Sequence, residues 1–254
     1  MSTLLECRDL EKSFGGVQAL AKVGFVIGEG EIYGLIGPNG AGKTTLFNLL
    51  TGIYAPDAGS ILFQGEQLSG LKSHEIVKKG IARTFQNIRL FAQLSALENV
   101  MIGRHTRTRA GVIGAILRDA GTRREEADIE ERAHALLQFV GLSERANHAA
   151  GNLPYGDQRR LEIARALATE PRLLALDEPA AGMNASETQS LRLLLSNIRA
   201  RGITLLLIEH DMRLVMGVCD RILVLDHGEK IAEGAPAEIQ GDARVIEAYL
   251  GAPA

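Results

Sequence analysis

Apolar and polar residues alternate near the start of the chain, whereas unbroken apolar runs occur further along. Val23, Phe25 and Ile27 in "AKVGFVI" recur with period two, which predicts a half-buried strand, and "GSILFQG" predicts a short strand between glycine turns. The runs "EIYGLIG", "RLLALDEP" and "ITLLLIEHD" are apolar enough for parallel strands covered on both faces. "RILVLDHGEKIAEG" is typical of a hairpin that turns around Asp226 to Glu229. These segments predict an α/β fold.

The middle of the chain has a different pattern. Apolar side chains there recur at helical spacing, at Ile129, Ala133, Leu136, Leu137 and Val140. The sequence contains no internal repeat, and no low-complexity linker separates this region from the β-rich ends. We therefore predict one domain over residues 1–254, with its core at about 1–83 and 153–254 and a helical insertion at about 84–152.

Composition and charge exclude several classes of protein. Apolar residues make up 46% of the 254 positions and charged residues 23%, which is ordinary for a globular protein. The net charge of −3 argues against a nucleic-acid binder. Cys7 and Cys219 lie far apart, which indicates buried, reduced thiols. There is no signal-peptide layout and no run of about 20 apolar residues, so we expect another subunit to supply any membrane span.

Residues 37–44, "GPNGAGKT", fit the phosphate-loop pattern G-x-x-x-x-G-K-[ST], with a predicted strand before it and a helix after it. Glycines allow successive backbone N–H groups to turn inward and surround phosphate oxygens. The helix that begins at Lys43 directs its positive dipole end to the same place. We predict a nucleoside triphosphate site in which Lys43 contacts the β- and γ-phosphates and the Thr44 hydroxyl holds Mg²⁺.

Two acids end the buried run "LLALDEP". Asp177 closes the strand, where a carboxylate can hold Mg²⁺ through its water shell. Strand alternation directs Glu178 elsewhere, towards an attacking water that it positions or deprotonates.

With these residues the chain resembles the ATP-binding subunits of ABC transporters over nearly its whole length. "GPNGAGKTTL" resembles Walker A, "LLALDEP" Walker B with its catalytic glutamate, "RTFQN" the Q-loop and "LLIEHD" the switch histidine. The resemblance implies a P-loop NTPase (RecA-like) core with an N-terminal antiparallel β subdomain and a helical insertion. It also implies hydrolysis of ATP with Mg²⁺. A small-molecule P-loop kinase, the other class considered, has neither a signature nor a switch histidine.

The resemblance assigns further roles to individual residues. It implies that Phe14 stacks on adenine, that Gln86 contacts Mg²⁺ and senses the permease, and that His210 binds the γ-phosphate. It also implies that the nucleotide is held by Gly37, Pro38, Asn39, Gly40, Ala41, Gly42, Lys43, Thr44 and Thr45.

"LPYGDQRRLEIARAL" stands where the family has its LSGGQ signature, which caps the γ-phosphate of a second protomer in a head-to-tail dimer. A helix N-terminus opened by a glycine turn suits such an anion. The residues concerned are Leu153, Pro154, Tyr155, Gly156 and Asp157.

Three of these residues depart from the family's pattern: Pro154 replaces serine, Tyr155 replaces glycine and Asp157 replaces glutamine. Asn184 also stands where an aspartate is usual in the D-loop. One interpretation is that the cap in trans is weakened, because the serine donor is lost and Asp157 adds a negative charge, which Arg159 and Arg160 would offset. The other is that the Tyr155 hydroxyl replaces the missing donor.

Other segments resemble the ATPases of branched-chain amino acid importers: "GIARTFQNIRLF", "PAAGMN", the Arg-rich insertion and the ending "VIEAYLG". The resemblance implies a homo- or heterodimer beneath membrane-spanning permease subunits, on the cytoplasmic side of the bacterial inner membrane. The resemblance further implies that a periplasmic solute-binding protein acts indirectly, and we expect no nucleic-acid partner.

The alternatives are the ATPase of a urea or amide importer, a lipid or lipopolysaccharide exporter, and a soluble ABC protein that acts on ribosomes or DNA. The Arg-rich segment 104–124 fits either a solvated face or a surface near anionic lipids or permease loops.

Overall fold

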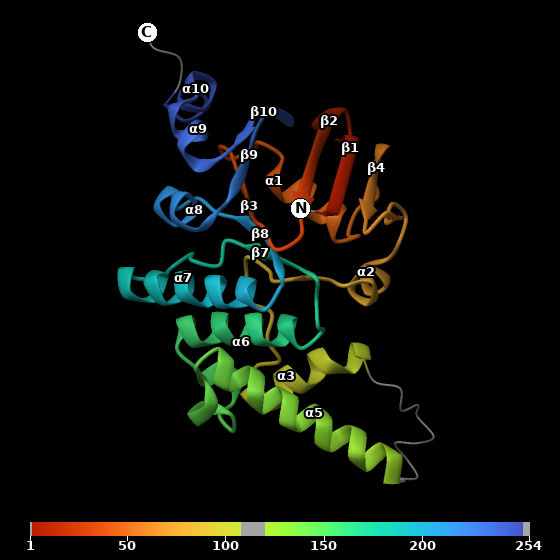
Figure 1. Cartoon of the computed structure of the whole chain (residues 1–254), viewed down its shortest axis with the longest axis vertical. Helices are drawn as coiled ribbons and strands as arrows, with labels where there is room; N and C mark the ends of the chain where they lie inside the picture. Colours follow the sequence, from red (N-terminus) through yellow and green to blue (C-terminus); the bar gives the residue numbers. More distant parts are fainter. Residues whose placement is uncertain (1, 108–119, 251–254) are drawn as a thin grey trace. The chain divides into compact units, whose positions relative to one another are not determined.

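The computed structural model describes residues 2–107 and 120–250 (Figure 1). The chain divides into two compact units: Met1–Ile76 with Arg172–Ala254, and Val77–Pro171. The helical insertion predicted at about 84–152 lies within the second unit. Helix α2 (Ser73–Lys79) crosses the boundary between the units.

One sheet of the first unit is antiparallel, with the strand order β2-β1-β4-β5. Its strands are β1 (Thr3–Phe14), β2 (Val17–Gly28), β4 (Ala58–Phe63) and β5 (Glu66–Gln67). The predicted period-two strand is confirmed, because Val23, Phe25 and Ile27 are all buried within β2. The β1–β2 turn consists of Gly15 and Gly16, both at positive φ, as a two-residue hairpin loop requires.

The other sheet of the first unit has its strands in the order β10-β9-β3-β8-β7. They are β3 (Ile32–Ile36), β7 (Leu173–Asp177), β8 (Thr204–Ile208), β9 (Arg221–Asp226) and β10 (Glu229–Gly234). β9, β3, β8 and β7 are parallel, whereas β10 returns antiparallel to β9. Every residue of β3, β7 and β8 is buried, and the hairpin turns between Asp226 and Glu229, as predicted.

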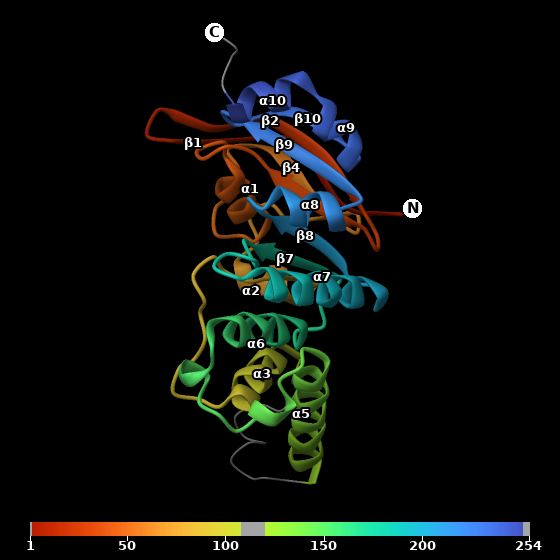
Figure 2. The same ribbon diagram turned by 90° about the vertical axis from the view of Figure 1, so that its left-hand side faces the viewer.

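Helices cover both faces of this parallel sheet. The chain leaves β3 towards β7 through α1 (Lys43–Leu50), then returns through α7 (Ala185–Ala200) to β8 and through α8 (Met212–Val218) to β9. Because crossovers are right-handed, this reversal places α1 on one face and α7 and α8 on the other (Figures 1 and 2). Helices α9 (Pro236–Gly241) and α10 (Ala243–Leu250) end the described chain.

The second unit is mainly helical. It contains β6 (Ile81–Arg83), α3 (Ala96–Arg104), α5 (Ala120–Phe139) and α6 (Tyr155–Leu167), with short 3₁₀ turns at His105–Arg107, Ser143–Arg145 and Ala150–Asn152. Helix α3 packs against both α5 and α6 (Figure 2). The predicted apolar face is confirmed: Ile129, Ala133, Leu137 and Val140 are buried, and Leu136 is half-buried.

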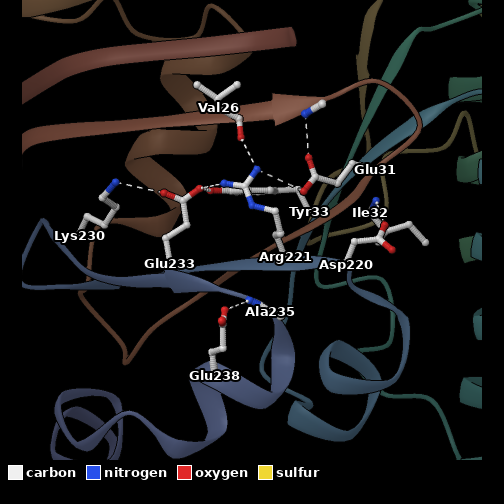
Figure 3. Close-up of polar contacts among 11 residues, drawn as sticks. Val26, Glu31, Ile32, Tyr33, Asp220, Arg221, Lys230, Glu233, Ala235 and Glu238 are labelled. Atoms are coloured by element: carbon white, nitrogen blue, oxygen red, sulfur yellow. Dashed lines mark hydrogen bonds and ion pairs between the residues drawn. The ribbon is translucent and has the colours of Figure 1, made fainter. Parts of the chain in front are cut away.

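A polar network joins the edges of both sheets in the first unit (Figure 3). Glu233 on β10 accepts hydrogen bonds from the Tyr33 hydroxyl at 2.8 Å and from Arg221, and lies 3.1 Å from Lys230 Nζ. Arg221 also donates to the carbonyl of Val26 on β2 at 3.2 Å. Burial, followed by the charge of Glu233, raises the pKa of Tyr33, so this hydroxyl remains a donor. Strands β2, β3, β9 and β10 are therefore linked through one carboxylate.

We expect Glu233→Ala to lower the free energy of unfolding by roughly 1.5–3 kcal/mol, because it leaves the buried Tyr33 hydroxyl without this acceptor. Equilibrium unfolding in urea measures the change as a shifted midpoint at unchanged slope. Glu6→Ala is the control, since it removes only the exposed pair with Arg8, and its midpoint should stay at the wild-type value. Equal midpoints for both variants would contradict a stabilising role for the network.

Candidate nucleotide-binding site

Several predicted site residues follow the carboxyl ends of adjacent parallel strands. In the sheet register Asp177 of β7 pairs with Ile208 of β8, and Ile208 pairs with Leu35 of β3. The chain segments that leave these strands therefore start at the same edge of the sheet. In open α/β sheets this edge is where ligands bind.

The phosphate loop leads from β3 into α1, which begins at Lys43 as predicted. Its N-cap, Gly42, has φ +100° and makes no side-chain hydrogen bond to the first turn, whose N–H groups can thus face an anion. A Cβ at Gly42 would lie 2.6 Å from the Ala19 carbonyl oxygen, and one at Gly37 would lie 2.1 Å from that of Leu225. Only glycine fits at these two positions.

Lys43 lies inside the loop that it follows. Its side chain is buried, and Nζ donates to the carbonyl oxygens of Gly37 at 2.6 Å and Pro38 at 2.8 Å. Burial lowers the pKa of Lys43, while the charges of Glu178 and Asp177 oppose that shift. A cation held beside open N–H groups fits a polyphosphate. Asp177, at the end of β7, and Glu178, which follows it, are near enough for their charges to act on Lys43.

Thr44 and Asp177 carry oxygen ligands of the kind that Mg²⁺ prefers. Asp177 is buried as the last residue of β7, while Thr44 is exposed in the first turn of α1. Their role in holding Mg²⁺ stays a prediction.

Glu178 and His210 come together although 31 residues separate them in the chain. His210 Nε2 lies 2.6 Å from Glu178 Oε1. Glu178 has φ +47°, a left-handed conformation that is uncommon outside glycine, and its N–H donates to the Ile208 carbonyl at 2.9 Å. The backbone thus leaves the strand at Glu178, whose side chain meets His210, while its predicted role towards an attacking water stays a prediction.

The sequence reasoning missed Glu209, which precedes the predicted switch histidine. Its side chain is buried and accepts a hydrogen bond from the Ala180 N–H at 2.7 Å. An acid that interrupts the apolar run "ITLLLIEHD" was the available signal.

Asn184, the residue that departs from the usual D-loop, caps α7. Its side chain accepts from the N–H groups of Ser186 at 2.9 Å and Glu187 at 3.0 Å, and Glu187 accepts from the Asn184 N–H at 2.8 Å. This capping box stabilises the helix start without a charge at position 184.

Phe14 ends β1 with 42% of its surface exposed. The Tyr54 ring packs edge-on against it at a centroid distance of 5.1 Å, and Lys12 Nζ lies 5.5 Å from its centroid. The exposed ring is consistent with the predicted stacking on adenine.

In the second unit, α6 begins at Tyr155 with Pro154 as N-cap, and no side chain caps its first turn. Gly156 lies inside that turn, so the glycine turn that we expected ahead of the helix is not formed. Leu153 is buried, and Tyr155 is exposed. The Tyr155 hydroxyl accepts from Arg159 Nη2 at 3.1 Å, which leaves its own proton available for donation.

Asp157 is buried and paired. Arg160 donates to one of its oxygens, and Arg145 Nε lies 2.9 Å from the other. Arg160 thus offsets the charge of Asp157 as expected, whereas the expectation for Arg159 is wrong. Arg159 pairs with Glu162 at 3.2 Å, because both side chains lie on the buried side of α6.

The segment around Gln86 is held by that same buried pair. Arg159 donates to the carbonyl oxygens of Phe85, at 2.6 Å, and of Gln86. Glu162 accepts from the N–H groups of Phe85 and Arg89, both at 3.3 Å. Burial is the main cause that raises the pKa of Glu162. The role of the Gln86 side chain stays a prediction.

Most of the Arg-rich segment 104–124 lies outside the described residues, since 108–119 are not among them. Arg104, at its start, pairs with Glu170 at 2.5 Å. Within residues 2–107 and 120–250, no helix is both long and apolar enough to cross a membrane.

Comparison with known families identifies the family to which these residues belong. Residues 20–181 match the family model described as ABC transporter, and this range contains the phosphate loop, the signature position and the acids Asp177 and Glu178. The chain belongs to the ABC transporter family. It is an ABC-type ATPase that binds and hydrolyses ATP. Residues 229–254 of this ATPase also match a model described as branched-chain amino acid ATP-binding cassette transporter.

Two curated relatives, one named for amino acid transport and one for lipopolysaccharide export, differ in their sequence identity to this chain. The high-affinity branched-chain amino acid transport ATP-binding protein BraF of Pseudomonas aeruginosa is 46% identical over 249 residues, 98% of each chain. The lipopolysaccharide export system ATP-binding protein LptB of Acidithiobacillus ferridurans is 36% identical over 251 residues, 99% of this chain and 98% of LptB.

Solved cassettes confirm the predicted P-loop NTPase fold of this ABC ATPase. The ADP conformation of MJ1267, an ATP-binding cassette of an ABC transporter, superposes with a TM-score of 0.86 at 31% identity, covering 99% of this chain and 100% of MJ1267. MJ0796 in a dimeric post-hydrolysis state bound to ADP and phosphate gives 0.78 at 26% identity, covering 92% and 99%.

Because base–aromatic stacking contributes about 1–3 kcal/mol, we expect Phe14→Ala to raise the Kd for ATP about 5- to 150-fold. Isothermal titration calorimetry measures this change. Val17→Ala is the matched control, since Val17 is the cross-strand partner of Phe14 and is 71% exposed, and its Kd should equal that of the wild type. Equal affinities for Phe14→Ala and wild type would mean that the ring serves only to pack against Tyr54.

Proposed function

We propose that this ABC ATPase energises the uptake of branched-chain amino acids or of closely related amino acids. The observation that carries the proposal is the match of residues 229–254 to the branched-chain family, because this segment lies outside the general ABC match. The higher identity to BraF than to LptB supports import over lipopolysaccharide export.

We further propose that the chain works as a pair, with a second copy or with another ABC ATPase subunit, beneath permease subunits on the cytoplasmic side of the bacterial inner membrane. A periplasmic solute-binding protein would deliver the amino acid. The dimeric state of the MJ0796 relative supports pairing. In such a pair, Leu153, Pro154, Tyr155, Gly156 and Asp157 of one protomer would face the γ-phosphate bound by the other.

The chemistry proposed for the chain is positioning and charge stabilisation of phosphoryl transfer to water. Lys43 and the N–H groups at the start of α1 bind the phosphates, and Thr44, Asp177 and Gln86 would hold Mg²⁺. That ion, when bound, neutralises charge on the phosphate oxygens. Glu178 orients the attacking water and accepts its proton, while His210 donates a hydrogen bond to the γ-phosphate.

Solute uptake tests the proposal directly. In cells that lack this chain, uptake of radiolabelled leucine, isoleucine and valine should fall to background. The wild-type chain should restore uptake, and Glu178→Gln should not, although it is expressed to the same level. Urea uptake and lipopolysaccharide delivery to the outer membrane should be unchanged. Normal leucine uptake together with a defect in one of the other two processes would overturn the proposed substrate.

A further inference from the structure

The carboxylate of Glu209 lies between the two loops that follow β7 and β8. One oxygen, Oε1, accepts from the Ala180 N–H at 2.7 Å, and the other, Oε2, accepts from the His210 N–H at 3.1 Å. The Asp211 N–H is 3.5 Å from Oε2. Ala180 belongs to the loop 179–184 after β7, whereas His210 belongs to the loop after β8.

This link extends the sheet beyond its last ladder contact. The Glu178 N–H still donates to the Ile208 carbonyl, at 2.9 Å, but Glu178 then leaves the strand with φ +47°. Beyond that point the Glu209 side chain joins the two loops in place of a backbone ladder bond. One carboxylate therefore bridges the Ala180 and His210 backbones beyond the last ladder contact.

Burying a carboxylate in this position is costly. Glu209 is only 3% exposed, and an unpaired buried charge is strongly disfavoured. Burial is the main cause that raises the pKa of Glu209, the three N–H contacts oppose that shift, and the nearby charge of Glu178 adds to it. A carboxylate is the group whose two oxygens can both accept, whereas an amide of the same size has one acceptor and one donor.

We infer that Glu209 is a positioning residue for ATP hydrolysis, which fixes the His210 backbone against the loop 179–184 and so holds the imidazole at Glu178. The distance of 2.6 Å between His210 Nε2 and Glu178 Oε1 is the geometry that it maintains. This inference rests on the roles proposed above for Glu178 and His210. Glu209 itself acts only through backbone groups of its neighbours.

The first test is turnover of Glu209→Gln, which keeps the size of the side chain and places an NH₂ group where one oxygen accepted an N–H. Because displacement by about 1 Å can cost roughly 100-fold in rate, we expect kcat to fall about 10- to 100-fold. The Kd values for ATP and ADP should stay within about twofold of wild type, since no contact to the phosphate loop is removed.

The matched control is Glu238→Gln. Glu238 also accepts a backbone N–H, that of Ala235 at 2.8 Å, but it caps α9. Its kcat should equal that of the wild type. If Glu209→Gln does not fold, Glu209→Asp keeps both acceptor oxygens on a shorter side chain, and a kcat below wild type at unchanged Kd is expected. Wild-type kcat in a folded Glu209 variant would overturn the inference.

A double-mutant cycle separates positioning of His210 from a general structural effect. In the His210→Ala background, Glu209→Gln should lower kcat by no more than about twofold further, because the group that it positions is gone. Multiplicative losses in the double variant would overturn positioning through His210. If His210→Ala and Glu178→Gln alone retain wild-type turnover, the proposed roles of those residues fail; if they lose turnover while Glu209→Gln does not, only the inference fails.

Hydrogen–deuterium exchange of the nucleotide-free protein gives a readout independent of activity. The amides of Ala180 and His210 should exchange faster in Glu209→Gln than in wild type, because their carboxylate acceptor is changed. The same amides should exchange at the wild-type rate in Glu238→Gln. Unchanged exchange at both amides in Glu209→Gln would contradict the proposed link between the loops.

Discussion

Glu178→Gln should lower ATP turnover about 10²- to 10⁴-fold while leaving the Kd values for ATP and ADP unchanged. The reason is that an amide cannot accept the proton of the attacking water, although it has the shape of the carboxylate. Glu178 side-chain exposure is 16%, and the phosphate contacts expected in the loop come from other residues. Steady-state phosphate release and calorimetry together measure the two quantities.

Trapped ATP should also favour a stable dimer of Glu178→Gln, visible by sedimentation with ATP and Mg²⁺ across a concentration series. Glu229→Gln is the control for the lost charge, because Glu229 is exposed in the β9–β10 hairpin, and its turnover should be that of the wild type. Turnover of Glu178→Gln within a few-fold of wild type would assign the role of base to another group.

His210→Ala should bind ADP normally and hydrolyse ATP about 10²- to 10³-fold more slowly, the range found when one donor to a developing charge is removed. The imidazole is 44% exposed and contacts Glu178 at 2.6 Å, so its removal leaves the core intact but releases the glutamate. Single-turnover hydrolysis with saturating ATP measures the effect on the chemical step.

The control for the loss of an imidazole is His134→Ala, at an exposed position of α5. It should match the wild type in both assays. If His210→Ala weakened ADP and ATP binding equally, His210 would serve the fold and not the γ-phosphate.

The phosphate loop shows how much the sequence determines when all the parts are local. Gly37, Gly42 and Lys43 lie within seven consecutive residues between a strand and a helix, and the cap, the open first turn and the buried ammonium follow from their order. The apolar runs likewise predicted β3, β7 and β8, because parallel strands covered on both faces admit few polar residues.

Helix α6, at the signature position, has contacts that such local reasoning could not predict. The sequence indicated that Arg160 could offset the charge of Asp157, three residues earlier on the same helix. It did not indicate Arg145, which approaches from a 3₁₀ turn, nor that Arg159 would pair with Glu162 on the buried side of the same helix. Which arginine meets which acid depends on the face of α6 that packs inward.

The sequence by itself determined the class of site and the strands that carry it, and it predicted the residues that act there. Only the tertiary structure decided that Glu178 leaves its strand in a left-handed conformation, that His210 meets it at 2.6 Å and that Glu209 holds the two loops together. The physical reason is that these contacts join segments brought together by the pairing of β7 with β8. A backbone angle and a strand register fix them, and neither is encoded in the spacing of residue types along the chain.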